Sequence, residues 1–463
     1  MERKNAWAAY AEDDSRVEAF AKAYCDFINN GKTERECVAY GEKLAKAHGF
    51  EDLNAVIRSG RKLEAGARVY VNWMGKSFML FVLGAKPLEE GMNILGAHID
   101  SPRIDVKQNQ LYEDGDLAYL DTHYYGGIKK YQWVAMPLAL HGVIIKKNGE
   151  KVPVNIGEDE NDPVFCISDL LIHLAQEQMA KNAKDVVEGE ALNLIVGGRP
   201  LAGEEKDAVK ANVLKLLDDK YGVEEEDFLS AELEIVPAGK ARDMGFDRSM
   251  ILGYGHDDRV CAYPSMMAVL DYEGTPDYTL CCIITDKEEI GSVGATGMAS
   301  HYLENTVAEL YACTADYCEL AVRRCLRNSR MLSSDVSAGY DPNFASAFEK
   351  KNSAFLGRGI CFNKFTGSRG KSGSNDANPE FMASLRKIMD DAGVAFQTAE
   401  LGRVDLGGGG TIAYLCAKYG MNVIDSGIAV LSMHAPYEII SKVDLYEGYR
   451  CYCAFLKGAK PVD

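Results

Sequence analysis

The sequence predicts an α/β fold: a larger domain with a mixed sheet and helices on both faces, interrupted by a smaller β-rich domain. Two observations lead to this fold class. Strand-like apolar runs alternate with amphipathic helical segments at both ends of the chain. The middle of the chain is instead rich in short strands and glycine, which is typical of an antiparallel sheet.

The first part of the chain predicts helices followed by strands. Residues 13–58 space their apolar residues at three and four, and the pattern breaks at glycine, as expected for two or more helices. Three strand-like runs follow, with the sequences ARVYVNW, SFMLFVLG and MNILGAHID. Short apolar runs bounded by turn residues favour buried strands in a sheet.

A β-rich zone begins near residue 105, and its segment KKNGEK indicates a hairpin. We expect a helix near 167–182 and an acidic helical stretch near 204–228. After about residue 245 the alternation resumes: CAYPSMMAVLDY and VGATGMASHYLENTVAEL predict helices, YTLCCIIT and MNVIDSGIAV predict strands, and KVDLYEGYRCYCAFLKGA predicts a closing helix. The expected domains are therefore 1–105 with 245–463, and an insert at 106–244.

Composition excludes several classes of protein. The 463 residues are too many for one simple core, so two domains are expected. A net charge of −18 argues against nucleic acid as a partner. The 13 cysteines lie mostly in apolar settings without a CxxC pair, which is typical of buried thiols in a reducing compartment. The N-terminus lacks the apolar core of a signal peptide and no apolar run reaches membrane length, so we expect a cytoplasmic protein without a membrane partner.

The stretch TLCCIITDKEEIGSVG, at 279–294, contains an unusual arrangement of charge. An apolar run that reads as a buried strand ends at once in Asp286, Lys287, Glu288 and Glu289. Two adjacent carboxylates beside an apolar core repel each other and are costly to desolvate. A cation at this position would offset both costs.

Four other segments share this form, an apolar run that ends in side chains able to bind a metal. They are NILGAHIDSP with His98 and Asp100, GYGHDDRVCA with Asp257 and Asp258, RMLSSDVSAGYDPN with Asp335, and IAVLSMHAP with His434. Taken singly, each has an ordinary explanation: a core histidine, a turn or helix cap, or a solvated helix face.

Together these segments favour a metal site. Ligands of open α/β sheets gather at the carboxyl ends of the strands, so the five segments can form one constellation. Two histidines with several carboxylates suit zinc, although manganese or cobalt also fit, and the excess of carboxylates suits two ions that share a bridging ligand. Asp100 can orient the ring of His98. Two such ions would lower the pKa of a shared water, and a neighbouring glutamate would accept its proton.

The ordered motifs GAHIDSP, DDRVCA, DKEEIGS, SSDVSAGYDPN and VLSMHAP resemble the dinuclear zinc aminopeptidase family of aspartyl aminopeptidase and vacuolar-type aminopeptidase I, most of all its bacterial branch. The resemblance covers nearly the whole chain. It implies a zinc-exopeptidase catalytic domain, a dimerisation role for the insert, and tetrahedral dodecamers built from dimers. It also implies peptide substrates with a free N-terminus.

The resemblance also implies residue roles. The expected metal ligands are His98, Asp257 as the bridge, Glu289, Asp335 and His434. Glu288 corresponds to the catalytic general base, and Asp100 to the residue that orients His98.

His173, in SDLLIHLAQEQMA, is a further candidate catalytic residue. By itself the pattern favours a histidine on an amphipathic helix. In the family the histidine of this segment reaches into the active site of a neighbouring subunit and stabilises the developing oxyanion. The glycine run at 407–410 is not a P-loop, because no Lys-Ser/Thr follows it, and it either lines a substrate cleft or forms a tight loop capped by Thr411.

The chain departs from the family at one position. Aspartyl aminopeptidases carry a lysine that binds the acidic side chain of the substrate, whereas here Cys361 stands near that position, with Lys364 and Lys371 nearby. The preferred N-terminal residue, acidic or neutral, therefore stays open. The alternatives to an aminopeptidase are a related co-catalytic zinc hydrolase, either a deacylase or a carboxypeptidase, and a non-catalytic peptide-binding shell protein.

Overall fold

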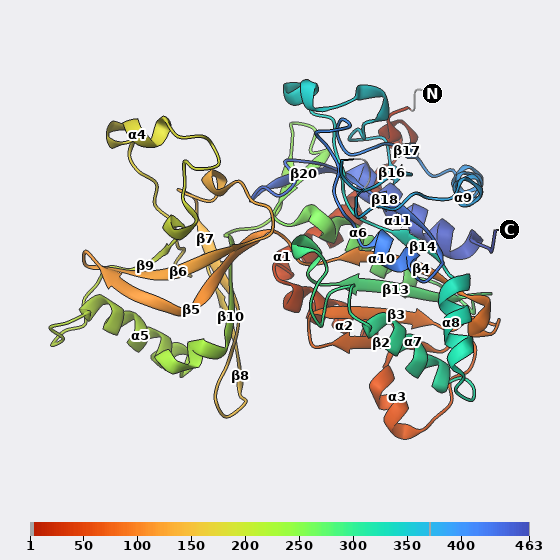
Figure 1. The fold of residues 1–463 in the computed structure, drawn as a ribbon, viewed down its shortest axis with the longest axis horizontal. Helices are drawn as coiled ribbons and strands as arrows, with labels where there is room; N and C mark the ends of the chain where they lie inside the picture. Colours follow the sequence, from red (N-terminus) through yellow and green to blue (C-terminus); the bar gives the residue numbers. More distant parts are fainter. Residues whose placement is uncertain (1–3, 370–371, 463) are drawn as a thin grey trace. The chain divides into compact units, whose positions relative to one another are not determined.

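The computed structural model describes residues 4–369 and 372–462, and the chain divides into two compact units (Figure 1). The larger unit contains the residues up to Asp100, Ala241–Met433 and those from Glu438 onward. The smaller unit contains Ser101–Lys240 and the short segment His434–Tyr437. The dimerisation role of the smaller unit stays a prediction.

A nine-stranded mixed sheet forms the centre of the larger unit. Its strands β3, β13 and β4 show why the sheet is mixed, because β13 runs antiparallel to β3 and parallel to β4. The order across the sheet is β1 (Glu51–Asp52), β2 (Arg68–Trp73), β3 (Ser77–Val82), β13 (Thr279–Thr285), β4 (Met92–His98), β14 (Arg330–Ser333), β18 (Asn422–Gly427), β16 (Ile360–Asn363) and β17 (Phe396–Thr398). The predicted α/β class with a mixed sheet is confirmed.

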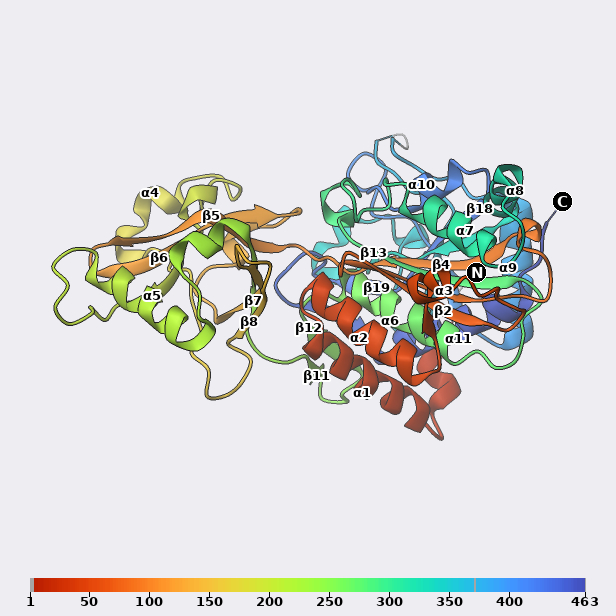
Figure 2. The same ribbon diagram turned by 90° about the horizontal axis from the view of Figure 1, so that it is seen from below.

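Helices cover both faces of this sheet, as Figure 2 shows. The first core contains side chains from α1 (Ser15–Asn30), α2 (Glu34–Ala47), α6 (His256–Leu270), α9 (Pro379–Ala392) and α11 (Lys442–Gly458). The second core contains side chains from α3 (Leu53–Ser59), α7 (Tyr302–Ala312), α8 (Glu319–Asn328) and α10 (Ala413–Ala417). Successive side chains of a strand enter the two cores in alternation: in β4, Leu95 and Ala97 belong to the first core and Ile94 belongs to the second.

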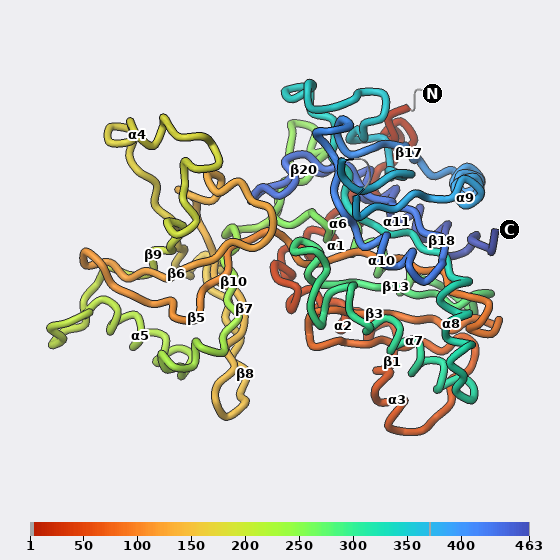
Figure 3. The backbone as a smooth tube through the Cα atoms, in the orientation of Figure 1, coloured from red at the N-terminus to blue at the C-terminus, as the bar shows by residue number. Residues whose placement is uncertain are grey.

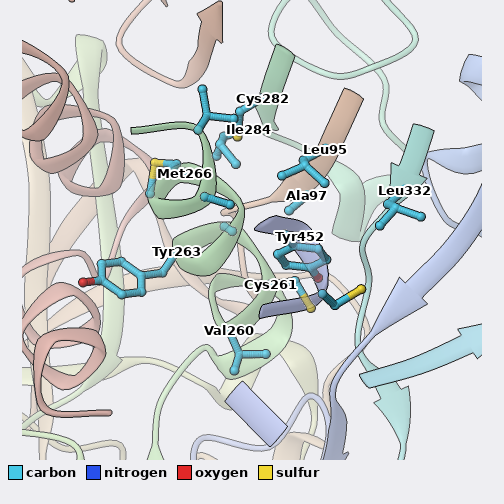
Figure 4. Close-up of a cluster of buried hydrophobic side chains, with 14 of the residues drawn as sticks. Leu95, Ala97, Val260, Cys261, Tyr263, Met266, Cys282, Ile284, Leu332 and Tyr452 are labelled. Atoms are coloured by element: carbon cyan, nitrogen blue, oxygen red, sulfur yellow. The ribbon is translucent and has the colours of Figure 1, made fainter. Parts of the chain in front are cut away.

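The packing behind the strand ends is made of apolar side chains. Figure 4 shows Leu95 and Ala97 of β4, Ile284 of β13 and Leu332 of β14 in the cluster that also contains Val260 of α6, and all five side chains are buried. Close packing of this kind limits how far a strand end can move. The side chains that follow these strands are therefore held on a rigid edge.

Local signals set the ends of the helices. The side chain of Thr33 caps α2 by accepting a hydrogen bond from the backbone of Glu36, 3.3 Å away, and the Glu36 carboxylate accepts one from the Thr33 backbone at 3.1 Å. This reciprocal arrangement is a capping box.

A five-stranded sheet of the same unit runs in the order β11 (Arg242–Met244), β12 (Met250–Gly253), β20 (Glu438–Ser441), β19 (Ala429–Leu431) and β15 (Ser337–Ala338).

The smaller unit is built on an antiparallel six-stranded sheet. Its order is β8 (Lys151–Ile156), β7 (Leu138–Ile145), β10 (Ala231–Pro237), β5 (Arg103–Asp114), β6 (Leu117–Tyr125) and β9 (Leu194–Gly197). The hairpin predicted at KKNGEK joins β7 to β8 (Figure 3), and Gly149 in its turn has a φ of 87°, which favours glycine. The acidic helical stretch forms α5 (Ala208–Tyr221).

Two predicted helices are wrong in extent. Within 167–182 the chain forms only a 3-10 turn, η4 (Ile172–Leu174), and one turn of helix, α4 (Gln176–Met179). Most of the large apolar side chains of this segment are exposed, from Leu170 to Leu174 and at Met179, and a helix this short is marginal without packing. In the segment 293–310 the helix α7 begins only at Tyr302, because Gly294 has a left-handed φ of 92° and a side chain at Gly297 would lie 2.3 Å from the Ser292 carbonyl oxygen.

None of the described helices is both long and apolar enough to cross a membrane. All 13 cysteines are free thiols, and most are buried, as the sequence predicts.

Candidate metal centre

Three neighbouring strands of the large sheet end at the same edge and carry polar side chains there. β4 ends in His98, which pairs in register with Thr285 at the end of β13. β14 lies on the other side of β4, and Asp335 follows its last residue by two positions. Because the three strands are parallel, their carboxyl ends bring His98, the segment after Thr285, and Asp335 to one region.

The structure brings five of the predicted site residues into two groups that share His98. In the first group, ligand atoms of His98, Asp257 and Glu289 all lie within 4.8 Å of one another. In the second, those of His98, Glu288 and Asp335 do the same. The His98 Nε2 atom lies 3.3 Å from Asp257 Oδ1. These distances are those expected of side chains that face a common ion or pair of ions.

Asp100 fixes three neighbours of the centre. Its carboxylate accepts one hydrogen bond from the backbone N–H of Glu288 and one from that of Glu289, both at 3.1 Å. The His98 Nδ1 atom lies 3.0 Å from the Asp100 carbonyl oxygen and 3.3 Å from its carboxylate. One buried carboxylate therefore holds the backbone of both glutamates and leaves Nε2 of His98 facing Asp257.

Glu288 and Glu289 do not continue the strand. They begin a 3-10 turn, η7 (Glu288–Ile290), and Lys287 before them has a left-handed φ of 68°. The alternation of consecutive strand residues therefore does not describe these two side chains. Both enter the groups around His98, but each in a different group.

Asp257 and Asp258 lie at the start of α6, joined by a cis peptide bond. The backbone N–H of Asp257 donates to the Glu438 carboxylate at 2.9 Å. The carboxylate of Asp258 accepts a hydrogen bond from the backbone N–H of His98 at 3.3 Å. Asp258 thus supports the end of β4, while Asp257 contacts the imidazole ring.

The charges at this edge are strongly coupled. Burial raises the pKa of Asp258 to about 8, against the opposing effect of His98. Burial and the nearby Glu288 raise the pKa of Asp335 well above its usual range. Burial alone would lower the pKa of His98, but hydrogen bonds to Asp100 and Asp257 outweigh it and raise the pKa. Without a cation, these carboxylates would be forced to bind protons.

The donor set fits a metal. An imidazole and several carboxylates, carried by the strand ends and by the start of α6 and within 4.8 Å in each group, are the ligands that zinc and similar divalent ions use. A divalent ion would also offset the mutual repulsion of the carboxylates. The residues present can therefore hold such an ion.

A second set of contacts, centred on Asp286, shapes the loop that carries the glutamates; sequence reasoning gave this residue no role. The Asp286 carboxylate accepts a hydrogen bond from the Thr296 hydroxyl at 2.6 Å and lies 2.9 Å from Lys287 Nζ. The hydroxyl of Ser77 donates to the Thr296 carbonyl at 2.6 Å and accepts from the Asp286 backbone at 3.2 Å. The only signal in the sequence was a carboxylate directly after a buried strand, two residues before Glu288.

Gly427 of β18 allows Asp335 to approach the sheet. A side chain at Gly427 would lie 1.7 Å from the Asp335 carbonyl oxygen, which no other residue type tolerates. Glycine is therefore required for this backbone contact. Sequence reasoning gave this glycine no role either.

Two predicted site residues, His434 and His173, belong to the smaller unit. His434 has a left-handed φ of 64°, and its Nδ1 atom lies 3.0 Å from the Gly127 carbonyl oxygen. His173 lies in η4 and is exposed. Their parts in the active site stay predictions.

Cys361 stands near the position where aspartyl aminopeptidases carry a lysine that binds the acidic side chain of the substrate. Cys361 lies buried in β16, where its thiol donates to the Asn363 side chain at 3.2 Å, and burial raises its pKa to about 12. Lys364 forms an ion pair with Asp376. Lys371 lies outside the described residues.

The Thr411 hydroxyl after the glycine run donates to buried Asp425 at 2.5 Å and also accepts from the Ala413 backbone at 3.2 Å.

Comparisons with known proteins agree with this site. The family model described as aminopeptidase I zinc metalloprotease (M18) matches residues 27–456. A probable M18 family aminopeptidase 1 of Clostridium acetobutylicum is 58% identical over 458 residues, 98% of each chain.

Solved structures are similar over nearly the whole chain. The M18 aminopeptidase of Thermotoga maritima has a TM-score of 0.94 at 42% identity and covers 99% of this chain and 100% of its own. Aminopeptidase I of C. acetobutylicum has a TM-score of 0.92 at 56% identity, with 98% and 99% covered. The mApe1 dodecamer of S. cerevisiae, at 21% identity, TM-score 0.74 and 96% and 97% coverage, shares the fold. These likenesses favour an aminopeptidase over a deacylase, a carboxypeptidase or a non-catalytic shell protein. The chain therefore belongs to the M18 family, the aminopeptidase I zinc metalloproteases, and is a metalloaminopeptidase.

Proposed function

We propose that the chain binds two divalent ions, zinc in the native protein, and removes the N-terminal residue from peptides. The ligands would be His98, Asp257, Glu289, Asp335 and His434. The observation that carries the proposal is the pair of side-chain groups around His98, each within 4.8 Å. Two groups of three on one rigid edge suit two ions better than one.

Asp257 is the best candidate for the ligand shared by both ions. His98 belongs to both groups, but its Nδ1 atom is occupied by Asp100, so the ring has a single nitrogen to offer. An imidazole with one available nitrogen binds one ion, whereas a carboxylate has two oxygens and can bridge. The Asp257 carboxylate lies 3.3 Å from His98 Nε2, the nitrogen that would bind an ion.

When bound, the ions would supply a water of lowered pKa and polarise the scissile carbonyl. Glu288 would accept the proton of that water and pass it to the leaving amine as the peptide bond breaks. Asp100 would act as a positioning residue, since it holds the Glu288 backbone at 3.1 Å. Raised carboxyl pKa values at this edge agree with such a site, where a base near neutrality is useful.

We propose a homo-oligomer in which His173 completes the site of a neighbouring chain. Support comes from the apolar side chains around His173. Such a cluster of exposed apolar side chains is unusual on a protein surface: Leu170, Leu171, Ile172 and Leu174 are 47–68% exposed. The smaller unit would provide this dimer contact. The solved yeast mApe1 is a dodecamer, and a tetrahedral dodecamer built from dimers is the assembly we propose here.

The substrates would be peptides with a free N-terminus. An acidic preference is not part of the proposal, because the thiol of Cys361 is buried and neutral and Lys364 is paired with Asp376. A scan of aminoacyl substrates that differ in the N-terminal side chain measures this preference with each of zinc, manganese and cobalt.

The test of the function is the variant Glu288→Gln. Gln is nearly isosteric but cannot accept the proton, so turnover of peptides with a free N-terminus should be lost while two zinc ions per chain remain. Elemental analysis and a matched acetylated peptide, which wild type should not cleave, complete the experiment. Near-native kcat in the variant would exclude Glu288 as the base, and one zinc per active wild-type chain would exclude the dinuclear site.

A further inference from the structure

A buried carboxylate of the larger unit holds two loops together. Asp425, in β18, is buried, and one of its oxygens accepts a hydrogen bond from the Thr411 hydroxyl at 2.5 Å. The other oxygen accepts one from the Thr366 hydroxyl at 3.3 Å. Thr411 follows the glycine run 407–410, whereas Thr366 belongs to the loop after β16. Asp425 is therefore a clamp between two segments that are far apart in the sequence.

Each threonine is also bound within its own loop. The Thr411 hydroxyl accepts a hydrogen bond from the Ala413 backbone at 3.2 Å, and the Thr366 hydroxyl accepts one from the Asn375 backbone at 3.1 Å. The Asn375 side chain donates to the Val423 carbonyl of β18 at 2.9 Å. A hydroxyl that donates to one group and accepts from another fixes the position of both.

The two loops also meet backbone to backbone. The Gly367 backbone donates to the Gly409 carbonyl at 2.9 Å. A side chain at Gly408 would lie 2.3 Å from the Gly367 carbonyl oxygen, and one at Gly407 would lie 1.8 Å from the Leu401 carbonyl oxygen. The chain itself therefore requires glycine at 407 and 408, where no other residue fits.

Gly409 has no such reason within its own chain. Nothing lies within 4 Å of the place where its side chain would stand, and its φ lies outside the left-handed range. Among the glycines that the structure describes, Gly409 alone combines these two properties, because every other glycine with such open space has a left-handed φ. A glycine without a local reason is expected where another molecule comes close to the backbone.

The same stretch of backbone is free to bind. Gly409 and Gly410 are exposed, and their backbone N–H groups donate to none of the residues that the structure describes. Extended peptides are recognised through backbone groups of this kind, which pair with the carbonyl groups of the peptide.

The clamp faces the side of the sheet that carries the metal centre. Ile94 in β4 and Val423 in β18 both belong to the second core. Because side chains alternate along a strand, His98, four residues after Ile94, and Asp425, two residues after Val423, face the side of that core. Only β14 separates the two strands in the sheet.

The glycine run itself ends beside β4. A side chain at Gly96 would lie 3.3 Å from the Cδ1 atom of Ile412, the residue after Thr411. Gly96 precedes His98 by two residues in the same strand. The backbone at Gly409 and Gly410 is thus held near the edge at which a substrate of the metal centre must lie.

We propose that Asp425 is a positioning residue for the peptide substrate, and that it clamps the glycine run so that the substrate main chain binds along Gly409 and Gly410. The inference rests on the proposed function, because a peptide is the molecule that a metalloaminopeptidase brings to this edge. Of the two predictions for the glycine run, it selects the substrate cleft, and the contacts of Thr411 shape that cleft.

A matched pair of variants tests the clamp. In the full-length zinc protein, Thr411→Val removes the hydroxyl with little change of shape, and Thr411→Ser keeps a hydroxyl. We expect Thr411→Val to raise KM for tripeptides with N-terminal leucine or aspartate by about 3- to 10-fold, as for one lost hydrogen bond, with kcat and zinc content unchanged. Thr411→Ser should keep the wild-type KM. Asp425→Asn, which leaves one acceptor oxygen for two threonines, should resemble Thr411→Val.

A second pair tests the binding surface. Gly409→Ala adds a methyl group in open space, so the fold and zinc content should not change, whereas KM should rise by about tenfold because the substrate main chain is kept away. Gly189→Ala in the smaller unit is the control. Its methyl group would make an ordinary contact of 3.5 Å with Tyr124, and KM should stay at the wild-type value.

The outcomes separate this inference from the proposed function. A wild-type protein that holds zinc but hydrolyses neither tripeptide would overturn both. An active wild type with unchanged KM in Thr411→Val and Gly409→Ala would overturn only the role of Asp425 and the glycine run. Loss of zinc, kcat or thermal stability in step with the rise in KM would show a purely structural role and would also overturn the inference alone.

Discussion

Replacing Asp100 by asparagine should damage the metal centre without removing any proposed ligand. Asp100 accepts the backbone N–H groups of Glu288 and Glu289 with its two carboxylate oxygens, each at 3.1 Å, and lies 3.3 Å from His98 Nδ1. Asparagine keeps the shape but has a single acceptor oxygen. Its amide NH₂ would face a backbone N–H donor, so one glutamate must lose its hydrogen bond and shift.

The size of the effect follows from these contacts. A hydrogen bond to a charged group contributes about 1.5–3 kcal/mol, and Asp100→Asn removes one and weakens the other by removing the charge. At about 1.4 kcal/mol for each factor of ten, the loss corresponds to roughly 10- to 100-fold in zinc affinity and in kcat/KM. Glu288 and Glu289 themselves remain, so two zinc ions should still bind at high concentration.

Asp444 provides a matched control for this variant. It is also a buried aspartate whose two oxygens accept backbone N–H groups, from Gly357 and Gly359, both at 2.6 Å. Asp444→Asn should therefore destabilise the fold by a similar amount without changing zinc affinity. Competition with a zinc chelator, peptide hydrolysis and urea unfolding measure the three quantities. The reasoning is refuted if Asp100→Asn keeps wild-type zinc affinity and kcat/KM, or if Asp444→Asn loses as much of either.

Three further outcomes are expected. Asp257→Ala should lose both zinc ions by elemental analysis, because a bridging carboxylate serves two sites, whereas Asp335→Ala should lose one; equal losses would contradict the bridge. Mixed assemblies of Glu288→Gln and His173→Phe chains should exceed both parents in activity, since a His173→Phe site can borrow the histidine of its neighbour; failure after verified exchange would place His173 within its own chain. Burial raises the pKa of Asp425 to about 7, so the folded state keeps a proton that the unfolded chain releases near pH 4. This group should therefore cost metal-free wild type up to about 4 kcal/mol of stability as pH rises from 4 to 7, and Asp425→Asn should show a loss smaller by that amount, because Asp258 and Asp335 also have raised pKa values and still contribute; urea unfolding of both proteins at both pH values decides it.

The strands and the grouping of polar residues were predictable because both depend on short-range patterns. The continuous apolar run in MNILGAHID predicts a strand whose two faces are both buried, and the structure places Leu95 and Ile94 in opposite cores. Strand ends that carry His98 and Asp335 then meet because parallel strands share an edge. Their identity as metal ligands stays a prediction.

The segment around His173 could not be predicted from its pattern. Its leucines have helical spacing, but spacing produces a helix only where a core receives the apolar face. Here Leu170, Leu171 and Leu174 are all exposed in the unit, and the chain forms a 3-10 turn and one turn of helix instead. We propose that a second chain covers these apolar side chains. Their spacing along the sequence therefore does not reveal which conformation the segment adopts in a single chain.

The adjacent glutamates show a different limit of sequence reasoning. From the sequence, one of the two glutamates is expected to bind a metal while the other works beside it, and their different directions are attributed to the alternation of a strand end. The structure ends the strand at Thr285 and turns at Lys287, whose left-handed backbone begins the 3-10 turn. The backbone N–H groups of Glu288 and Glu289 in that turn then donate to the carboxylate of Asp100, which follows His98 at the end of β4 by two residues. A turn held by one negative charge thus brings one glutamate into each group around His98, and it is this arrangement, rather than the glutamate pair alone, that makes the edge suitable for a cation.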